Sequence, residues 1–261
     1  MVEPDPTKIV TFRPAPGSTT DYVATVFQST NSPTVTSSLV ITDVASGVSA
    51  SYKLPFLATT QAYVDSNDYI YIGDSGSNVW EAPLFTTTGG FSNLGLSRTW
   101  VPLNNSSANP SASSFGTSAT TSGGASALTY IGGAYENGFE YLRLQSVTRL
   151  TVIENEANGW QPVWTSYVSS SGTGGASWNS TSGTYVSNSN IFSLPTGSVI
   201  SNPGRIVNGA IQLPVTQPPT SGSACAEPPA YLYPYQVTDG TLTLPHFRGH
   251  LTSRECWLQM S

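Results

Sequence analysis

The chain has 261 residues and a formal net charge of −6, and 9% of its residues are charged, against about 25% in an average soluble domain. It has no cluster of Lys and Arg that would neutralise phosphates, so its composition excludes nucleic acid as a partner. It also has no apolar run of the roughly 20 residues needed to span a bilayer, so we expect no membrane insertion.

Short runs of β-branched and apolar residues, separated by Gly, Pro, Asn and Ser, recur along the whole chain. They predict an all-β fold, an antiparallel β-barrel or sandwich with long surface loops rich in Ser, Thr and Gly. The expected strands cover residues 8–13, 21–28, 34–42, 47–53, 61–72, 78–82, 127–131, 138–144, 148–153, 163–168, 205–213, 231–237 and 241–244. The first four are expected to form a meander. Residues 145–157 come nearest to a helical pattern, but their Thr and Val content favours a strand.

The segment Gly73-Asp74-Ser75-Gly76 resembles the sequence around the nucleophile of chymotrypsin-like serine proteases. That chemistry needs a histidine as general base, and the family places it before the serine. Here both histidines, His246 and His250, come after it. Turn chemistry explains the segment as the connection of a β-hairpin. The sequence therefore predicts no catalytic residue and a protein that is not an enzyme.

Several aromatic residues alternate with other residues in strand-like segments, which places their rings on one face of a strand. Such a face either packs in a core or stacks against a sugar ring. Two isolated aromatic residues in polar segments either pin their own loops or contact a ligand. The candidate receptor- or glycan-binding residues are Tyr69, Tyr71, Trp80, Phe115 and Trp178.

Two groups of acidic residues are candidate chemical sites. Glu154 and Glu156 are two residues apart, so in a strand they share a face, from which they could act on a glycosidic bond or hold a cation. Asp65, Asp68 and Asp74 lack the spacing of a calcium-binding loop. Neither group has a second supporting feature, so we expect solvated carboxylates, no metal and no cofactor.

Two long segments are low in complexity, residues 104–124 and 169–189, and both are expected to be exposed loops because they carry little apolar surface to bury. A Pro-rich arm follows later in the chain. The expected organisation is therefore a β-barrel or sandwich projection domain over residues 1–213. Residues 214–261 are expected to form the arm and C-terminal strands that pack on the same domain.

The chain has two cysteines, Cys225 and Cys256. A disulfide between them would stabilise the protein by about 3 to 4 kcal/mol in the chain-entropy model. Two buried free thiols are the other possibility, and both remain open. With His246 and His250 the cysteines would form a zinc site with irregular outer spacings, which does not favour a metal.

A hydroxyl-rich composition, low charge, long Ser/Thr/Gly loops, a linker-like opening over residues 1–7 and widely spaced Lys and Arg together resemble the projecting domain of a non-enveloped virus capsid. Among these the chain most resembles an astrovirus capsid spike, over its whole length but without a diagnostic motif. The resemblance implies a β-barrel-centred spike on the extracellular surface of the virion. It also implies a homodimer that attaches the virion to a host-cell receptor or glycan and presents antigenic surfaces to neutralising antibodies.

Two other functions fit the same composition. One is a secreted carbohydrate-binding lectin. The other is a β-fold glycoside hydrolase that uses carboxylates such as Glu154 and Glu156. The resemblance to a capsid spike carries over no catalytic residues.

Overall fold

The computed structural model describes residues 9–12, 21–29, 36–84, 97–100, 127–157, 159–169, 175–218, 229–243 and 247–249. Within these ranges every regular element is a β-strand, and every strand pair is antiparallel. The predicted all-β, antiparallel fold class is confirmed. Among the residues that are described, no helix is long and apolar enough to cross a membrane.

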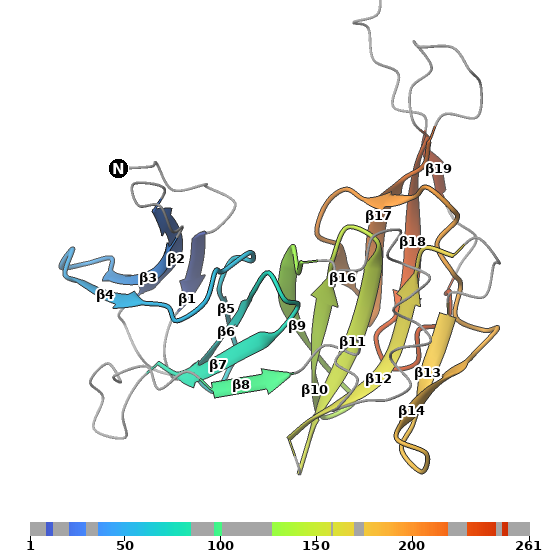
Figure 1. Cartoon of the computed structure of the whole chain (residues 1–261), viewed down its shortest axis with the longest axis horizontal. Coiled ribbons are helices and arrows are strands. Elements are labelled where there is room, and N and C mark those ends of the chain that lie inside the picture. The colour runs from blue at the N-terminus through green and yellow to red at the C-terminus, as the bar shows by residue number, and fades with distance from the viewer. Residues whose placement is uncertain are drawn as a thin grey trace, which may run out of the picture.

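The strands form four sheets that follow one another in chain order (Figure 1). The first two are four-stranded meanders. The first contains β1 (Ile9–Phe12), β2 (Tyr22–Ser29), β3 (Thr36–Asp43) and β4 (Ser49–Lys53). The second contains β5 (Tyr63–Val64), β6 (Tyr69–Gly73), β7 (Val79–Pro83) and β8 (Ser97–Trp100). The first sheet is the predicted meander, with every strand end within two residues of its expected position.

The third and fourth sheets follow in the C-terminal half. The third is six-stranded, with β9 (Tyr130–Glu136), β10 (Phe139–Gln145), β11 (Arg149–Glu156), β12 (Gly159–Tyr167), β13 (Gly175–Asn179) and β14 (Thr184–Ser187) in chain order. The fourth contains β15 (Val199–Ile200), β16 (Arg205–Val207), β17 (Ala210–Thr216), β18 (Ala230–Gln236) and β19 (Phe247–Gly249). The expected strand within residues 145–157 is confirmed as β11.

Three hydrophobic clusters lie between successive sheets. Ala24, Val26, Leu39 and Ile41 of the first sheet pack with Ile70 and Ile72 of the second. Tyr71 and Val79 of the second pack with Ile131, Leu142 and Leu144 of the third. Leu150, Val152 and Trp164 of the third pack with Ile211, Leu213, Tyr233 and Tyr235 of the fourth. The two middle sheets are therefore covered on both faces, which explains why β6 and β10 are buried almost without alternation.

The expected strand over residues 205–213 is wrong as a single element. It divides into β16 and β17, joined by Asn208 and Gly209, which have φ angles of +50° and +73°. A two-residue Asn-Gly turn needs positive φ at both positions, and it reverses the chain. The same dipeptide, Asn137-Gly138, joins β9 to β10 with φ angles of +53° and +89°.

The expected long strand over residues 61–72 is also interrupted. Oδ1 of Asp65 accepts hydrogen bonds from the backbone N–H groups of Asn67, at 2.9 Å, and Tyr69, at 2.8 Å. Asp68 has a φ angle of +62°. These features make a tight turn between β5 and β6, because an aspartate side chain competes with the sheet for backbone N–H groups.

The expected exposed loop over residues 169–189 contains the β13–β14 hairpin instead. Ala176 and Tyr185 are buried there, and Trp178 pairs with Tyr185 across the hairpin in an edge-to-face contact with centroids 5.2 Å apart. Ala176, Trp178 and Tyr185 thus supply apolar contacts that the polar composition of this segment does not indicate. The other expected loop, residues 104–124, lies outside the described residues. The expected boundary after residue 213 falls inside β17.

Candidate functional site

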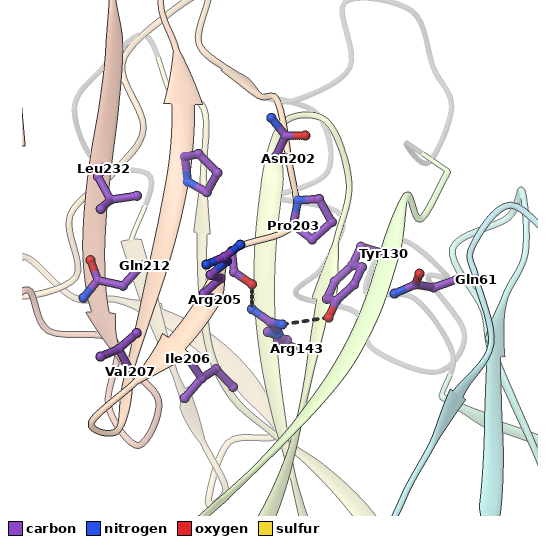
Figure 2. Close-up of a pocket in the computed structure, with 12 residues that line it drawn as sticks. Gln61, Tyr130, Arg143, Asn202, Pro203, Arg205, Ile206, Val207, Gln212 and Leu232 are labelled. Atoms are coloured by element: carbon purple, nitrogen blue, oxygen red, sulfur yellow. Dashed lines mark hydrogen bonds between the residues drawn. The ribbon is translucent and has the colours of Figure 1, made fainter. Parts of the chain in front are cut away.

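A groove of about 1130 Å³ lies where the edge of the third sheet meets the fourth sheet (Figure 2). Its walls come from the start of β9, from β10, from the loop before β16, and from β16, β17 and β18. Gln61, just before β5, also lines it. The lining residues are Gln61, Tyr130, Arg143, Asn202, Pro203, Gly204, Arg205, Ile206, Val207, Gln212, Pro214 and Leu232. None of them is acidic.

Arg143 on β10 is the buried polar residue of this groove, with 8% of its surface exposed. One terminal nitrogen, Nη2, donates a hydrogen bond to the Tyr130 hydroxyl at 2.7 Å. The other, Nη1, donates to the backbone carbonyl of Gly204, and the dashed lines of Figure 2 mark both bonds. The guanidinium also lies 4.7 Å from the centroid of the Tyr130 ring. Arg143 therefore ties β9 of the third sheet to the loop that leads into β16.

The charge of Arg143 is incompletely compensated. Its Nε is buried and has no hydrogen-bond partner. No carboxylate of the described residues forms an ion pair with it. Burial lowers the pKa of the Arg143 guanidinium, while the hydroxyls of Tyr130 and Tyr63 favour the charged form. Arginine stays charged in proteins, so a buried cation remains without an anion beside it.

The rim of the groove adds a second cation and several amides. Arg205, the first residue of β16, is exposed and follows the Gly204 carbonyl that Arg143 binds. Asn202 and Gln212 contribute amide groups from either side of it. The whole chain has nine Lys and Arg residues and a net charge of −6. Two of those nine cations, Arg143 and Arg205, line one groove in which no described lining residue is acidic.

A smaller cavity of about 270 Å³ adjoins the groove and shares four lining residues with it, Gln61, Tyr130, Asn202 and Pro203. Gln145 on β10 lines this cavity, and its Nε2 donates to the Asn202 carbonyl at 3.3 Å. Its Oε1 is buried without a partner, as is the Thr59 hydroxyl in the same lining. Both residues line the cavity, while these two oxygen atoms are buried within its wall.

Of the aromatic residues expected from the sequence to bind a ligand, the four that the structure describes, Tyr69, Tyr71, Trp80 and Trp178, do not line the groove. Tyr71 is 2% exposed, packs edge-to-face on Trp160 with centroids 5.7 Å apart, and donates to Oδ2 of Asp65 at 3.1 Å. Burial raises the pKa of Tyr71. Its ring belongs to the core and has no free face for a ligand.

The other candidates occupy different places. Trp80 stacks on Phe56 with centroids 4.6 Å apart and donates from Nε1 to Oδ2 of Asp74 at 2.8 Å. Tyr69 is 40% exposed at the start of β6, and Trp178 is half-buried in the β13–β14 hairpin. The structure does not bring these three together around one cavity. Phe115, Cys225 and Cys256 lie outside the described residues.

The segment around Ser75 forms the predicted hairpin turn between β6 and β7. Oδ1 of Asp74 accepts from the backbone N–H groups of Gly76, at 2.8 Å, and Asn78, at 2.9 Å, while Ser75 is exposed. Glu154 and Glu156 lie on β11, and neither lines the groove. The described residues contain no group of three or more His, Cys, Asp or Glu side chains that could hold a metal ion.

The groove residues escaped the sequence analysis, although one signal pointed to them. Residues Tyr141 to Gln145 read YLRLQ, which places Arg143 inside an apolar strand whose neighbours are buried. A lone arginine in such a run must find buried partners. The other groove residues come from loops and strands far apart in the sequence, and pattern alone does not bring them together.

Comparisons with known proteins provide no family assignment. No family model matches the chain, and no curated protein matches it. Among solved structures, the dihydro-heme d1 dehydrogenase NirN in complex with DHE is similar, with a TM-score of 0.39 and 13% sequence identity. The match covers 91% of this chain and 46% of that chain, so this chain spans less than half the length of that protein.

Proposed function

We propose that this chain is a non-catalytic attachment domain that binds a polar ligand on the host-cell surface through the groove around Arg143. The observation that supports this most directly is the lining of the groove, which combines two guanidinium groups with amide side chains and backbone carbonyls. Binding sites of this kind use a few polar groups to fix the orientation of a ligand. The exposed residues Asn202, Pro203 and Arg205 leave the groove accessible from solvent.

The sequence resemblance supplies the biological setting of this proposal. We place the domain on the virion surface, as a capsid spike of the astrovirus type that pairs as a homodimer. Host-cell receptor or glycan and neutralising antibodies are its proposed partners. A low-charge, hydroxyl-rich exterior and an all-β fold are consistent with that setting.

Binding is favoured over hydrolysis by the chemistry of the groove. A glycoside hydrolase needs two carboxyl groups about 5 to 9.5 Å apart on either side of the scissile bond. Among the residues that the structure describes, no carboxyl group lines this groove. A lectin would bind its ligand through the same groove. The two functions differ in whether the domain attaches a virion to the cell.

Cell binding by the purified domain tests the proposal. We expect saturable binding to susceptible cells, and we expect the domain to compete with virions for those cells. A lectin would bind cells without competing with virions. Absence of binding to cells from several hosts, for a protein with an intact cooperative melting transition, would contradict the proposal.

A further inference from the structure

The unmatched charge of Arg143 indicates the kind of ligand that the groove holds. A guanidinium has five N–H donors, and only the bonds to Tyr130 and Gly204 use them here, while Nε has no partner. A buried cation without an anion is costly, and its remaining donors favour an acceptor that carries negative charge. A neutral ligand would leave that charge uncompensated.

Arg205 makes an anion at this position more favourable. It is exposed, it forms no ion pair with any described carboxylate, and it lies one residue after the carbonyl that binds Arg143. Guanidinium groups bind carboxylates through paired, charge-assisted hydrogen bonds. Because none of the described lining residues is acidic, a bound carboxylate meets no like charge from them.

The amide groups of the groove indicate what else the ligand carries. Gln61, Asn202 and Gln212 line the groove with amide side chains. An amide both donates and accepts hydrogen bonds, so it matches the hydroxyl groups of a sugar. The cavity of about 270 Å³ adjoins the groove and shares Gln61, Tyr130, Asn202 and Pro203 with it.

We infer that the groove is a binding site for an acidic sugar, in which Arg143 and Arg205 hold the carboxylate while Asn202 and Gln212 bind sugar hydroxyls. This inference rests on the proposed attachment function and specifies its ligand. A single carboxylate fits better than a polyanion, since the net charge of −6 repels an extended chain of negative charges. The volume of the groove fits at least one sugar residue, because small-ligand sites span roughly 300 to 1,000 Å³.

The direct test compares two ligands that differ by one acidic sugar. Isothermal titration of the purified domain with 3′-sialyllactose and with lactose separates the contribution of the carboxylated sugar from that of the neutral one. We expect a Kd for sialyllactose at least about tenfold lower than for lactose, which corresponds to about 1.4 kcal/mol. We also expect the affinity to fall as sodium chloride is raised, since the pairing with exposed Arg205 is screened.

Variants assign the effect to the groove. Arg205→Gln removes an exposed charge and is expected to fold normally while raising the Kd for sialyllactose about five- to tenfold. Lys53→Gln removes an equally exposed charge on β4, in the first sheet, and is expected to leave the Kd unchanged. Arg143→Gln is expected to abolish acidic-sugar binding, and its melting curve shows whether the fold survives the loss of the bonds to Tyr130 and Gly204.

The outcomes separate the inference from the proposed function. Equal affinity for lactose and sialyllactose, or a Kd indifferent to Arg205→Gln, overturns the acidic-sugar site. Cell binding that survives sialidase treatment and the Arg205→Gln substitution overturns the site while leaving attachment intact. Groove-dependent binding of sialyllactose without any cell binding supports the site and removes the attachment function. Binding of neither cells nor sugars contradicts both.

Discussion

Gly133 on β9 shows how closely the second and third sheets approach each other at a single residue. A Cβ atom at this position would overlap the hydroxyl of Tyr63 and would lie 2.8 Å from Cε1 of its ring. The Tyr63 ring stacks on Tyr71, with centroids 6.1 Å apart, so it is not free to move aside. We expect Gly133→Ala to lower the free energy of unfolding by about 1 to 3 kcal/mol through overpacking, measured by urea denaturation.

A double-mutant cycle provides the control for Gly133. In a Tyr63→Ala background the space beside Gly133 is open, so the added cost of Gly133→Ala should nearly vanish. An equal loss of stability in both backgrounds would show that the glycine is needed for its backbone rather than for close approach.

The ionisation of Glu140 on β10, at the interface between the second and third sheets, makes the stability of the protein depend on pH. Burial, and next the nearby charge of Asp65, raise the pKa of the Glu140 carboxyl above its ordinary value. The folded state thus binds this proton more tightly than the unfolded state. Stability from this group is therefore highest below the ordinary glutamate pKa and falls as the pH rises through the raised pKa.

The substitution Glu140→Gln tests that sign. We expect a higher melting temperature than wild type at pH 7, with the difference shrinking toward pH 4, because the neutral amide resembles the protonated acid. Glu156→Gln is the control, since Glu156 is exposed at the end of β11. A destabilisation by Glu140→Gln at neutral pH would mean that its hydrogen bond from Asn155, at 3.3 Å, outweighs the burial of charge.

At the scale of elements, the Asn208-Gly209 turn positions the groove. β16 is a three-residue strand held to β17 by this turn, and it begins at Arg205. Gly209 has a φ angle of +73°, which an alanine adopts at a cost of about 1 to 2 kcal/mol. We expect Gly209→Ala to lower stability by about that amount and to speed amide hydrogen exchange in residues 205–207.

Gly47 is the control for the positive φ angle of this turn. It has a φ angle of +70°, lies before β4 in the first sheet, and has open space around the position of its missing Cβ, whereas a Cβ at Gly209 would lie 3.1 Å from Oε2 of Glu136. Gly47→Ala should lower stability through the positive φ angle alone, by about 1 to 2 kcal/mol, without changing exchange in β16. Unchanged exchange in β16 after Gly209→Ala would mean that the Arg143 bond to Gly204 alone holds the strand.

At the level of elements, some strands can be predicted from their own residues and others cannot. The sequence predicts β2, β3 and β18 because the apolar pattern that indicates a strand lies within each of these segments. The division of residues 205–213 was missed although Asn208-Gly209 is a strong hairpin signal. The β13–β14 hairpin was missed because its stability comes from Trp178 and Tyr185 meeting across strands. The groove was missed because its lining joins residues 61 to 232, whose proximity only the tertiary structure creates.

At the scale of the whole molecule, the stack of sheets leaves the outer face of the fourth sheet without a further sheet over it among the described residues. Val207 and Leu232 of this sheet line the groove, so the proposed ligand needs them uncovered. Val199 on β15 is 44% exposed, is not among the described lining residues of the groove, and pairs with Thr216 at the edge of the sheet. Exposed apolar surface in a weakly charged protein favours self-association.

Two-fold pairing around Val199 at the β15 edge, which leaves the groove open, is the arrangement that fits the spike proposal, because a closed two-fold contact buries the same patch on both copies. We expect light scattering to give about twice the chain mass of 27.5 kDa. Val199→Asp should return the mass to that of one chain, because it would bury an unpaired carboxylate of each copy in the contact. Val48→Asp, at a position 65% exposed before β4 in the first sheet, should leave the dimer intact. A wild-type mass of one chain would remove the homodimer from the proposal, whereas a dimer insensitive to Val199→Asp would place the contact on another face.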